Sequence, residues 1–87
     1  MKVTFRDRQY KVVFSEHAKT QMELRNLDET VIIEVIETGT VKEKDTKNKF
    51  WVFKSLKGRK DNMISVALAI ETPHLIVITA MVNWRPK

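Results

Sequence analysis

Two long apolar runs near the C-terminal end of the sequence most constrain how it can fold. Residues 63–70 and 75–82 are almost entirely apolar, and the short segment Glu71-Thr72-Pro73-His74 separates them. Runs of this length around a proline-containing turn are typical of neighbouring antiparallel strands. Because nearly every residue in both runs is apolar, both faces of each strand must be covered. We therefore expect this pair at the centre of a sheet.

Two segments upstream have the pattern of amphipathic helices. Ser15 and Asp28 are residue types favoured at helix N-caps, and each precedes apolar residues at helical spacing. Asn26 and Gly39 are residue types that commonly follow helix C-termini. Earlier in the chain, apolar and polar residues alternate through residues 2–14, which indicates a hairpin or an extended edge segment.

The predicted architecture is a single α+β domain over residues 1–87. Helical segments followed by a run of strands favour α+β over a parallel α/β fold. We therefore expect two N-terminal helices packed on a twisted antiparallel sheet of about four to six strands.

Charge is unevenly distributed along this chain, whose net charge is +5. Acids without bases occupy the segment from Asp28 to Glu37, whereas bases dominate from Lys42 to Lys60. A basic strand and loop favour a polyanionic partner such as nucleic acid, through contacts to phosphates. A solvated lysine-rich surface explains the same pattern.

The sequence also argues against several kinds of site and segment. It has no cysteine, and its two histidines and scattered acids lack the spacing of a metal site, so neither a metal nor another cofactor is expected. Charges near the N-terminus argue against a signal peptide, and the apolar runs are far shorter than the ~20 residues of a membrane helix. We expect a cytoplasmic protein with no membrane partner.

The first predicted helix carries a motif. It consists of His17, Ala18, Met22, Arg25 and Leu27. This pattern resembles a widespread small bacterial domain family of unknown function, and the likeness runs from Phe14 to Val82. That family is grouped by fold with the RelE, ParE and BrnT toxin superfamily, so the resemblance implies a RelE-like domain. Gln21 departs from the pattern, since a basic residue usually stands there.

The resemblance implies a toxin-like, metal-independent ribonuclease that cleaves messenger RNA and is neutralised by an antitoxin protein. Such cleavage needs a base for the ribose 2′-OH, an acid that protonates the leaving oxygen, and cations for the charged phosphorane. His17 lies in the first helical turn, where the helix dipole disfavours imidazolium, so its neutral ring could act as base. Arg25 lies two turns further along. Arg85 is added because residues at the end of the final strand often contribute to the site in RelE-like toxins.

The predicted catalytic residues also have a structural alternative. A local hydrogen bond could make His17 an anchor for the helix, and Arg25 could cap the carbonyl groups of the helix. Neither role needs a substrate.

The predicted RNA-binding residues come from three segments. They are Gln21, Lys54, Lys57, Arg59, Lys60 and Trp84. Basic side chains suit phosphates, and a tryptophan beside an arginine suits stacking with single-stranded bases. As an alternative, the basic loop is only solvated and Trp84 folds onto the edge of the sheet.

A non-catalytic module of the same fold is the alternative function. Gln21 in place of a base, and the lack of a second acid–base group, favour binding to a protein or nucleic acid without cleavage. A ParE-like toxin acting on a topoisomerase would likewise need no nuclease site. The acidic helix or the N-terminal edge strand would then be the interface. The free protein is expected to be a monomer or a weak homodimer.

Overall fold

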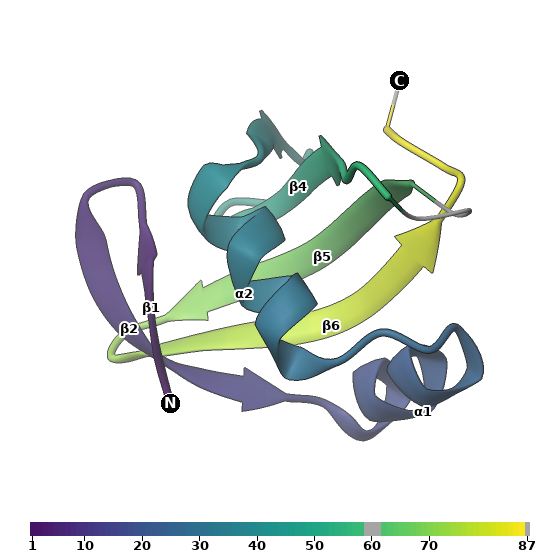
Figure 1. Cartoon of the computed structure of the whole chain (residues 1–87). Coiled ribbons are helices and arrows are strands. Elements are labelled where there is room, and N and C mark those ends of the chain that lie inside the picture. The colour runs from purple at the N-terminus through teal and green to yellow at the C-terminus, as the bar shows by residue number, and fades with distance from the viewer. Residues whose placement is uncertain (59–61, 87) are drawn as a thin grey trace.

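The computed structural model describes residues 1–58 and 62–86 and contains one sheet and two helices. In chain order the elements are β1 (Lys2–Phe5), β2 (Arg8–Phe14), α1 (Glu16–Leu24), α2 (Glu29–Thr38), β3 (Thr40–Glu43), β4 (Lys49–Ser55), β5 (Met63–Glu71) and β6 (His74–Val82). The strands form a six-stranded sheet in the order β1-β2-β6-β5-β4-β3 (Figure 1). Neighbouring strands are antiparallel except for β2 and β6, which run parallel.

The prediction of two N-terminal helices on an antiparallel sheet is wrong in two respects. The sheet is mixed, because β2 pairs in parallel with β6, from Lys11 beside His74 to Phe14 beside Val77. Both helices lie between β2 and β3 in the chain rather than at its N-terminus. Periodicity identifies a strand but carries no information about its partner, so the pairing of β2 with the distant β6 has no local signal.

The central position of the two apolar runs is confirmed. β5 and β6 are neighbours in the middle of the sheet, and each extends one residue beyond the predicted limits. Ile64, Leu68, Leu75 and Val77 have no exposed surface. These two strands therefore form the base of the core on which the other elements are arranged.

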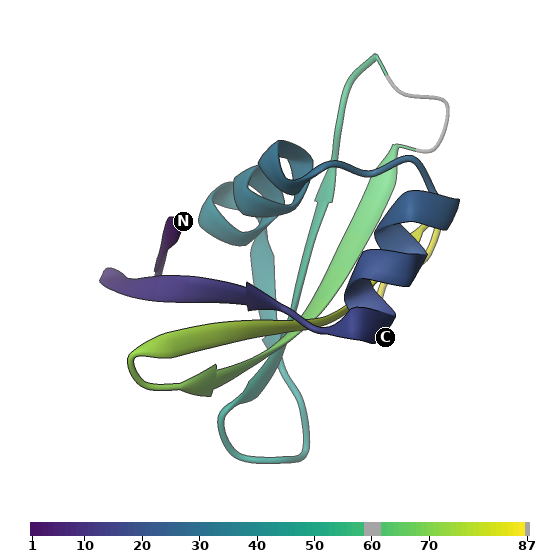
Figure 2. The ribbon, with the colours of Figure 1, turned by 90° about the horizontal axis from the view of Figure 1, so that it is seen from below.

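Helix α2 lies inside the curl of the sheet. It packs against β1, β4 and β5, although β1 and β4 are separated by three strands in the sheet order. The sheet must bend around the helix, and Figure 2 shows the strong twist between β2 and the strands β4 and β5. The curl brings the ring of Phe5 to 5.4 Å from that of Phe50, measured between centroids. A carboxylate oxygen of Glu37 on α2 accepts a hydrogen bond from the backbone N–H of Thr4 at 2.9 Å, on the edge strand β1.

The predicted helix caps are confirmed. The Ser15 hydroxyl accepts a hydrogen bond from the Ala18 N–H at 3.0 Å, and the Asp28 carboxylate accepts one from the Val31 N–H at 2.9 Å. The same Ser15 hydroxyl donates to the carbonyl of Ile78 at 2.9 Å, so the cap also attaches α1 to β6. Asn26 follows α1 with φ of 54°, the left-handed conformation that asparagine tolerates.

Gly39 ends α2 as predicted, but the reason is space rather than backbone conformation. Its φ of −80° and ψ of 178° are open to any residue. A Cβ atom at this position would lie 2.5 Å from the carbonyl oxygen of Val35 and 2.7 Å from that of Phe53. Glycine thus allows the end of α2 to approach β4 closely.

Candidate nucleic-acid interface

The predicted residues of α1 lie along one side of the helix. Ala18 and Met22 are buried in the core, and α1 packs against β6. His17, Gln21 and Arg25, spaced by four residues, run beside this buried stripe. His17 is exposed, whereas Gln21 and Arg25 are half-buried. The helix therefore presents these three side chains as a continuous row.

The structural alternatives for His17 and Arg25 find no support in the part of the chain that the structure describes. There, no hydrogen bond or ion pair involves the His17 ring, and the anchor of the helix is the Ser15 hydroxyl. The buried Nε of Arg25 has no hydrogen-bond partner among the same residues, and it is the backbone N–H of Arg25 that bonds to the carbonyl of Gln21. A buried donor without a partner is unfavourable.

Arg85 lies in the segment that follows β6, and it is exposed. Within residues 1–58 and 62–86, no hydrogen bond or ion pair connects it to His17 or Arg25. The three predicted catalytic residues are therefore divided between α1 and this segment, and their joint action stays a prediction.

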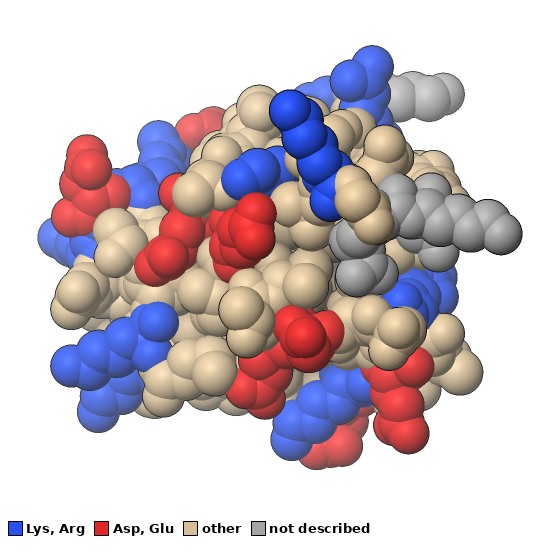
Figure 3. All heavy atoms as spheres, in the orientation of Figure 1, with Lys and Arg blue, Asp and Glu red and all other residues tan. Residues whose placement is uncertain are grey.

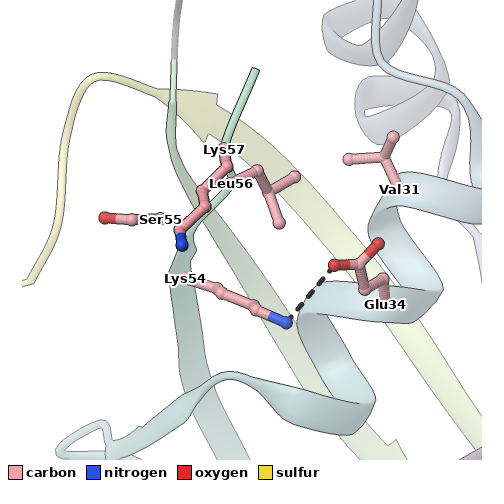
Figure 4. A pocket seen from close by; sticks show the side chains of 6 residues that line it. All are labelled: Val31, Glu34, Lys54, Ser55, Leu56 and Lys57. Carbon is pink, nitrogen blue, oxygen red and sulfur yellow. Dashed lines mark hydrogen bonds and ion pairs between the residues drawn. The ribbon is translucent and has the colours of Figure 1, made fainter. Parts of the chain in front are cut away.

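Lys54 lies on the side of the sheet that carries the helices. Its Nζ is 3.3 Å from a carboxylate oxygen of Glu34 on α2 (Figure 4). The same Nζ is 2.6 Å from the hydroxyl of Thr38, also on α2. Glu34 and Lys54 border a hollow of about 570 Å³ together with the exposed Lys57. A phosphate at Lys54 would have to compete with the Glu34 carboxylate. Arg59 and Lys60 lie outside the described residues.

The surface around α2 carries charges of both signs. Among the described residues on this face, Figure 3 shows acidic and basic side chains interspersed, with no broad area of one sign. Long-range attraction of a polyanion depends on an excess of positive charge over a surface. The described residues of this face therefore provide little excess positive charge to attract nucleic acid.

A second group of residues lies on the side of the sheet opposite the helices. It includes Trp84, which the sequence predicts to bind RNA, and other residues for which the sequence makes no such prediction. We call this side the helix-free face, defined by Trp51, Ser65, Ala67 and Ala69, which alternate with core residues along β4 and β5. Trp84 packs here against Trp51, with ring centroids 4.7 Å apart and ring planes inclined by 56°. The backbone carbonyl of Trp84 accepts a hydrogen bond from the Ser65 hydroxyl, which fixes the segment after β6 to the sheet.

Basic side chains lie beside the tryptophan pair. The Nζ of Lys44 is 5.1 Å from the centroid of the Trp51 ring, a cation–π distance. Lys42 is opposite Trp51 in the register of β3 and β4. With Trp84 they border a hollow of about 380 Å³, which Glu43 and Asp45 also line. Cations and aromatic rings therefore meet at this site, with two acids nearby.

The sequence identifies Trp84 as a candidate, but it indicates only packing for Trp51 and only a basic charge for Lys42 and Lys44. Lys42 and Lys44 are two residues apart, so on a strand they point to the same face. This spacing is the one feature of the sequence that could have identified Lys42 and Lys44 as a pair. Its meaning depends on the register that places Lys42 beside Trp51, which the sequence does not contain.

Two further kinds of feature are absent from the described ranges. Among residues 1–58 and 62–86, no group of three or more histidine or acidic side chains could hold a metal ion. No helix within those ranges is long and apolar enough to cross a membrane.

The helix motif and the strands that follow it match a known family. A family model described as "Domain of unknown function (DUF4258)" matches residues 14–82. The chain belongs to this family. The match to DUF4258 starts at the end of β2 and stops at the end of β6, so it includes both helices and four of the six strands. No curated protein and no solved structure matches the chain.

Proposed function

We propose that this DUF4258 protein binds single-stranded RNA on the helix-free face. The observation that carries the proposal is the tryptophan pair. Trp84 stays 39% exposed although it packs against Trp51, so part of its surface is available to a nucleobase. Stacking of bases on aromatic side chains is the usual way in which proteins hold unpaired nucleotides.

The charges around the pair favour the same ligand. Lys42 and Lys44 are two residues apart, and Lys42 lies beside Trp51 in the sheet, so both can reach the phosphates of a stacked strand. Glu43, between them, also lines the hollow, but its carboxylate is 3.7 Å from the guanidinium of Arg6. Asp45 is the other acid at the hollow. Stacking would therefore supply more of the affinity than charge.

Tryptophan fluorescence provides a direct test. Titration with a uridine decanucleotide should quench the emission, and Trp84→Ala should weaken binding, because one stacked base contributes ~1–3 kcal/mol, or roughly 5- to 150-fold in Kd. Trp84→Phe keeps a ring and should lose much less. Leu24→Ala, at an apolar side chain that is 72% exposed on α1, is the matched control and should bind like the wild type.

The salt dependence separates stacking from charge. Lys42→Gln and Lys44→Gln should each reduce the slope of log K against log salt by about 0.7, the value for one single-strand phosphate contact. If Trp84→Ala binds the oligonucleotide as tightly as the wild type does, the proposed interface is wrong. A thymidine oligodeoxynucleotide in parallel titrations tells whether the 2′-OH matters.

Cleavage of RNA beside α1 is a second proposed function, and the row of His17, Gln21 and Arg25 favours it. We propose that His17 removes the proton from a ribose 2′-OH while Arg25 holds the phosphate, as in a metal-independent ribonuclease of the RelE-like toxins. The 2′-oxygen then bonds to phosphorus, the bond from phosphorus to the 5′-oxygen breaks, and water protonates the leaving 5′-oxygen. The exposed position of His17 and the half-buried position of Arg25, two helical turns further along the chain, support these roles. Arg85 would add a cation from the segment after β6. An antitoxin protein would neutralise such an activity.

The two histidines of the chain supply a matched pair for testing cleavage. A fluorogenic RNA should be cut by the wild type and by His74→Ala, whose histidine lies at the start of β6, but not by His17→Ala. Arg25→Lys and Arg85→Gln should slow cleavage by ~10²–10³-fold, the usual effect of losing one group that stabilises transition-state charge. Equal cleavage by His17→Ala and the wild type, or binding without any cut product, excludes this second function and leaves the binding proposal intact.

A further inference from the structure

A hollow on the helix-bearing side of the sheet has a different chemistry from the tryptophan site. It measures about 480 Å³ and lies where the β1–β2 turn meets the β3–β4 turn. Phe50 lines it, whereas Trp51, the next residue of β4, belongs to the helix-free face. Alternation along a strand therefore separates the two sites onto opposite faces of the sheet.

The floor of this hollow is apolar and firmly held. Phe5 and Tyr10 are almost fully buried, at 3% and 9% exposure, and Phe50 and Ile70 complete the lining. The rings of Phe5 and Phe50 meet edge to face at 5.4 Å. Such a preformed surface can receive one apolar side chain without first being rearranged.

The rim of the hollow is cationic. Arg6, Arg8 and Lys47 line it, and no acidic residue is among the described residues that line it. The guanidinium carbon of Arg6 is 5.2 Å from the centroid of the Phe50 ring, while its partner Glu43 is largely exposed. In the described part of the chain, Arg8 and Lys47 take part in no ion pair. Positive charge over an apolar floor fits a ligand that is both apolar and anionic.

We propose that this hollow binds an acidic segment of a partner protein, with an apolar side chain on the floor and neighbouring carboxylates at Arg6, Arg8 and Lys47. A volume of about 480 Å³ falls within the range of pockets that hold small ligands, ~300–1,000 Å³, and so is ample for one side chain. Nucleic acid fits less well, because Arg6 covers one face of the Phe50 ring and Phe5 meets it edge to face, which hinders stacking by a base. The proposal stands on its own observations and does not depend on RNA binding.

The test uses the full chain and a labelled peptide in which phenylalanine is flanked by aspartate and glutamate. Fluorescence anisotropy should detect binding that weakens with salt, since the rim charges are exposed. Arg8→Gln and Lys47→Gln should each weaken it by roughly two- to five-fold, the usual size of an exposed charge pair, and the double variant by more. Lys19→Gln, on the exposed side of α1, should leave it unchanged.

Two control peptides and a map of the site decide the outcome. A peptide with asparagine and glutamine in place of the acids, and one with serine in place of phenylalanine, should both bind much more weakly. Backbone NMR shifts should centre on residues 5–8 and 47–50. Equal binding of the neutral peptide, unchanged binding by the double variant, shifts elsewhere, or tighter binding of a uridine oligonucleotide at these same residues would each overturn the proposal.

Discussion

Replacing Gly39 by alanine tests the close approach of α2 to β4. The new Cβ would lie 2.5 Å from the Val35 oxygen, 2.7 Å from the Phe53 oxygen and 2.9 Å from Cγ1 of Val52. Two of these atoms belong to the backbone, so the helix end or the strand has to move. Overpacking of this kind costs ~1–3 kcal/mol, and the two backbone contacts place Gly39→Ala in the upper half of that range. Alanine restores ~0.4–1 kcal/mol by restricting the unfolded chain.

The expected net loss is therefore about 1–2.5 kcal/mol in the free energy of unfolding. For a domain of this size that corresponds to a decrease in Tm of roughly 4–8 °C per kcal/mol. Urea denaturation followed by tryptophan fluorescence, together with thermal melts followed by circular dichroism, measures both quantities. A Gly39→Ala variant as stable as the wild type would refute the steric argument.

Gly58 is the matched control, because its glycine is required for a different reason. It has φ of +81°, and a Cβ added there would meet no heavy atom of residues 1–58 and 62–86 within 4 Å, so alanine faces backbone strain but no steric obstacle among them. Asparagine tolerates left-handed backbone. Gly58→Asn should therefore be more stable than Gly58→Ala, whereas Gly39→Asn should be no better than Gly39→Ala. If the asparagine variant were more stable than the alanine variant at both positions, the two glycines would not be required for different reasons.

Three further substitutions test the core and the helix contacts by urea denaturation. Ser15→Ala should lose about 1–3 kcal/mol, because it removes both the N-cap of α1 and the bond to β6, while Ser15→Thr keeps both groups. Leu68→Ala, at a fully buried position, should cost ~2–5 kcal/mol, and no loss there would contradict its place in the core. Lys54→Gln should change stability by less than ~1 kcal/mol, because its ion pair with Glu34 is partly exposed; a larger loss would show that the pair is structurally essential.

Features that depend on neighbouring residues were predictable from the sequence. Ser15 and Asp28 cap helices because their side chains reach N–H groups three residues away, and that distance is fixed by the chain itself. The extents of β5 and β6 follow from runs of apolar residues in the same way. The strand order was not predictable, since the parallel pairing of β2 with β6 joins segments that share no local pattern.

The candidate sites likewise include residues whose placement follows from local spacing and residues whose placement depends on strand pairing. The row from His17 to Arg25 follows from helical spacing alone, and the structure keeps it on one side of α1. The meeting of Trp51 with Trp84, and of Arg6 with Phe50, depends on register and on the curl of the sheet. The neighbours of these aromatic and basic side chains are therefore set by strand pairing, which the sequence does not show.

The parallel pairing of β2 with β6 also sets an order of events during synthesis on the ribosome. β2 and the N-cap of α1 are made early, but their partners, which include Val77 and Ile78, leave the ribosome only after most of the domain. At a translation rate of ~5–20 residues per second, about 3–13 s pass between the synthesis of β2 and that of its partner β6. During this interval its alternating apolar residues are open to chaperones or to other nascent chains. Slow translation of the segment before β6 should therefore lower the yield of folded protein more than equal slowing within β1 and β2.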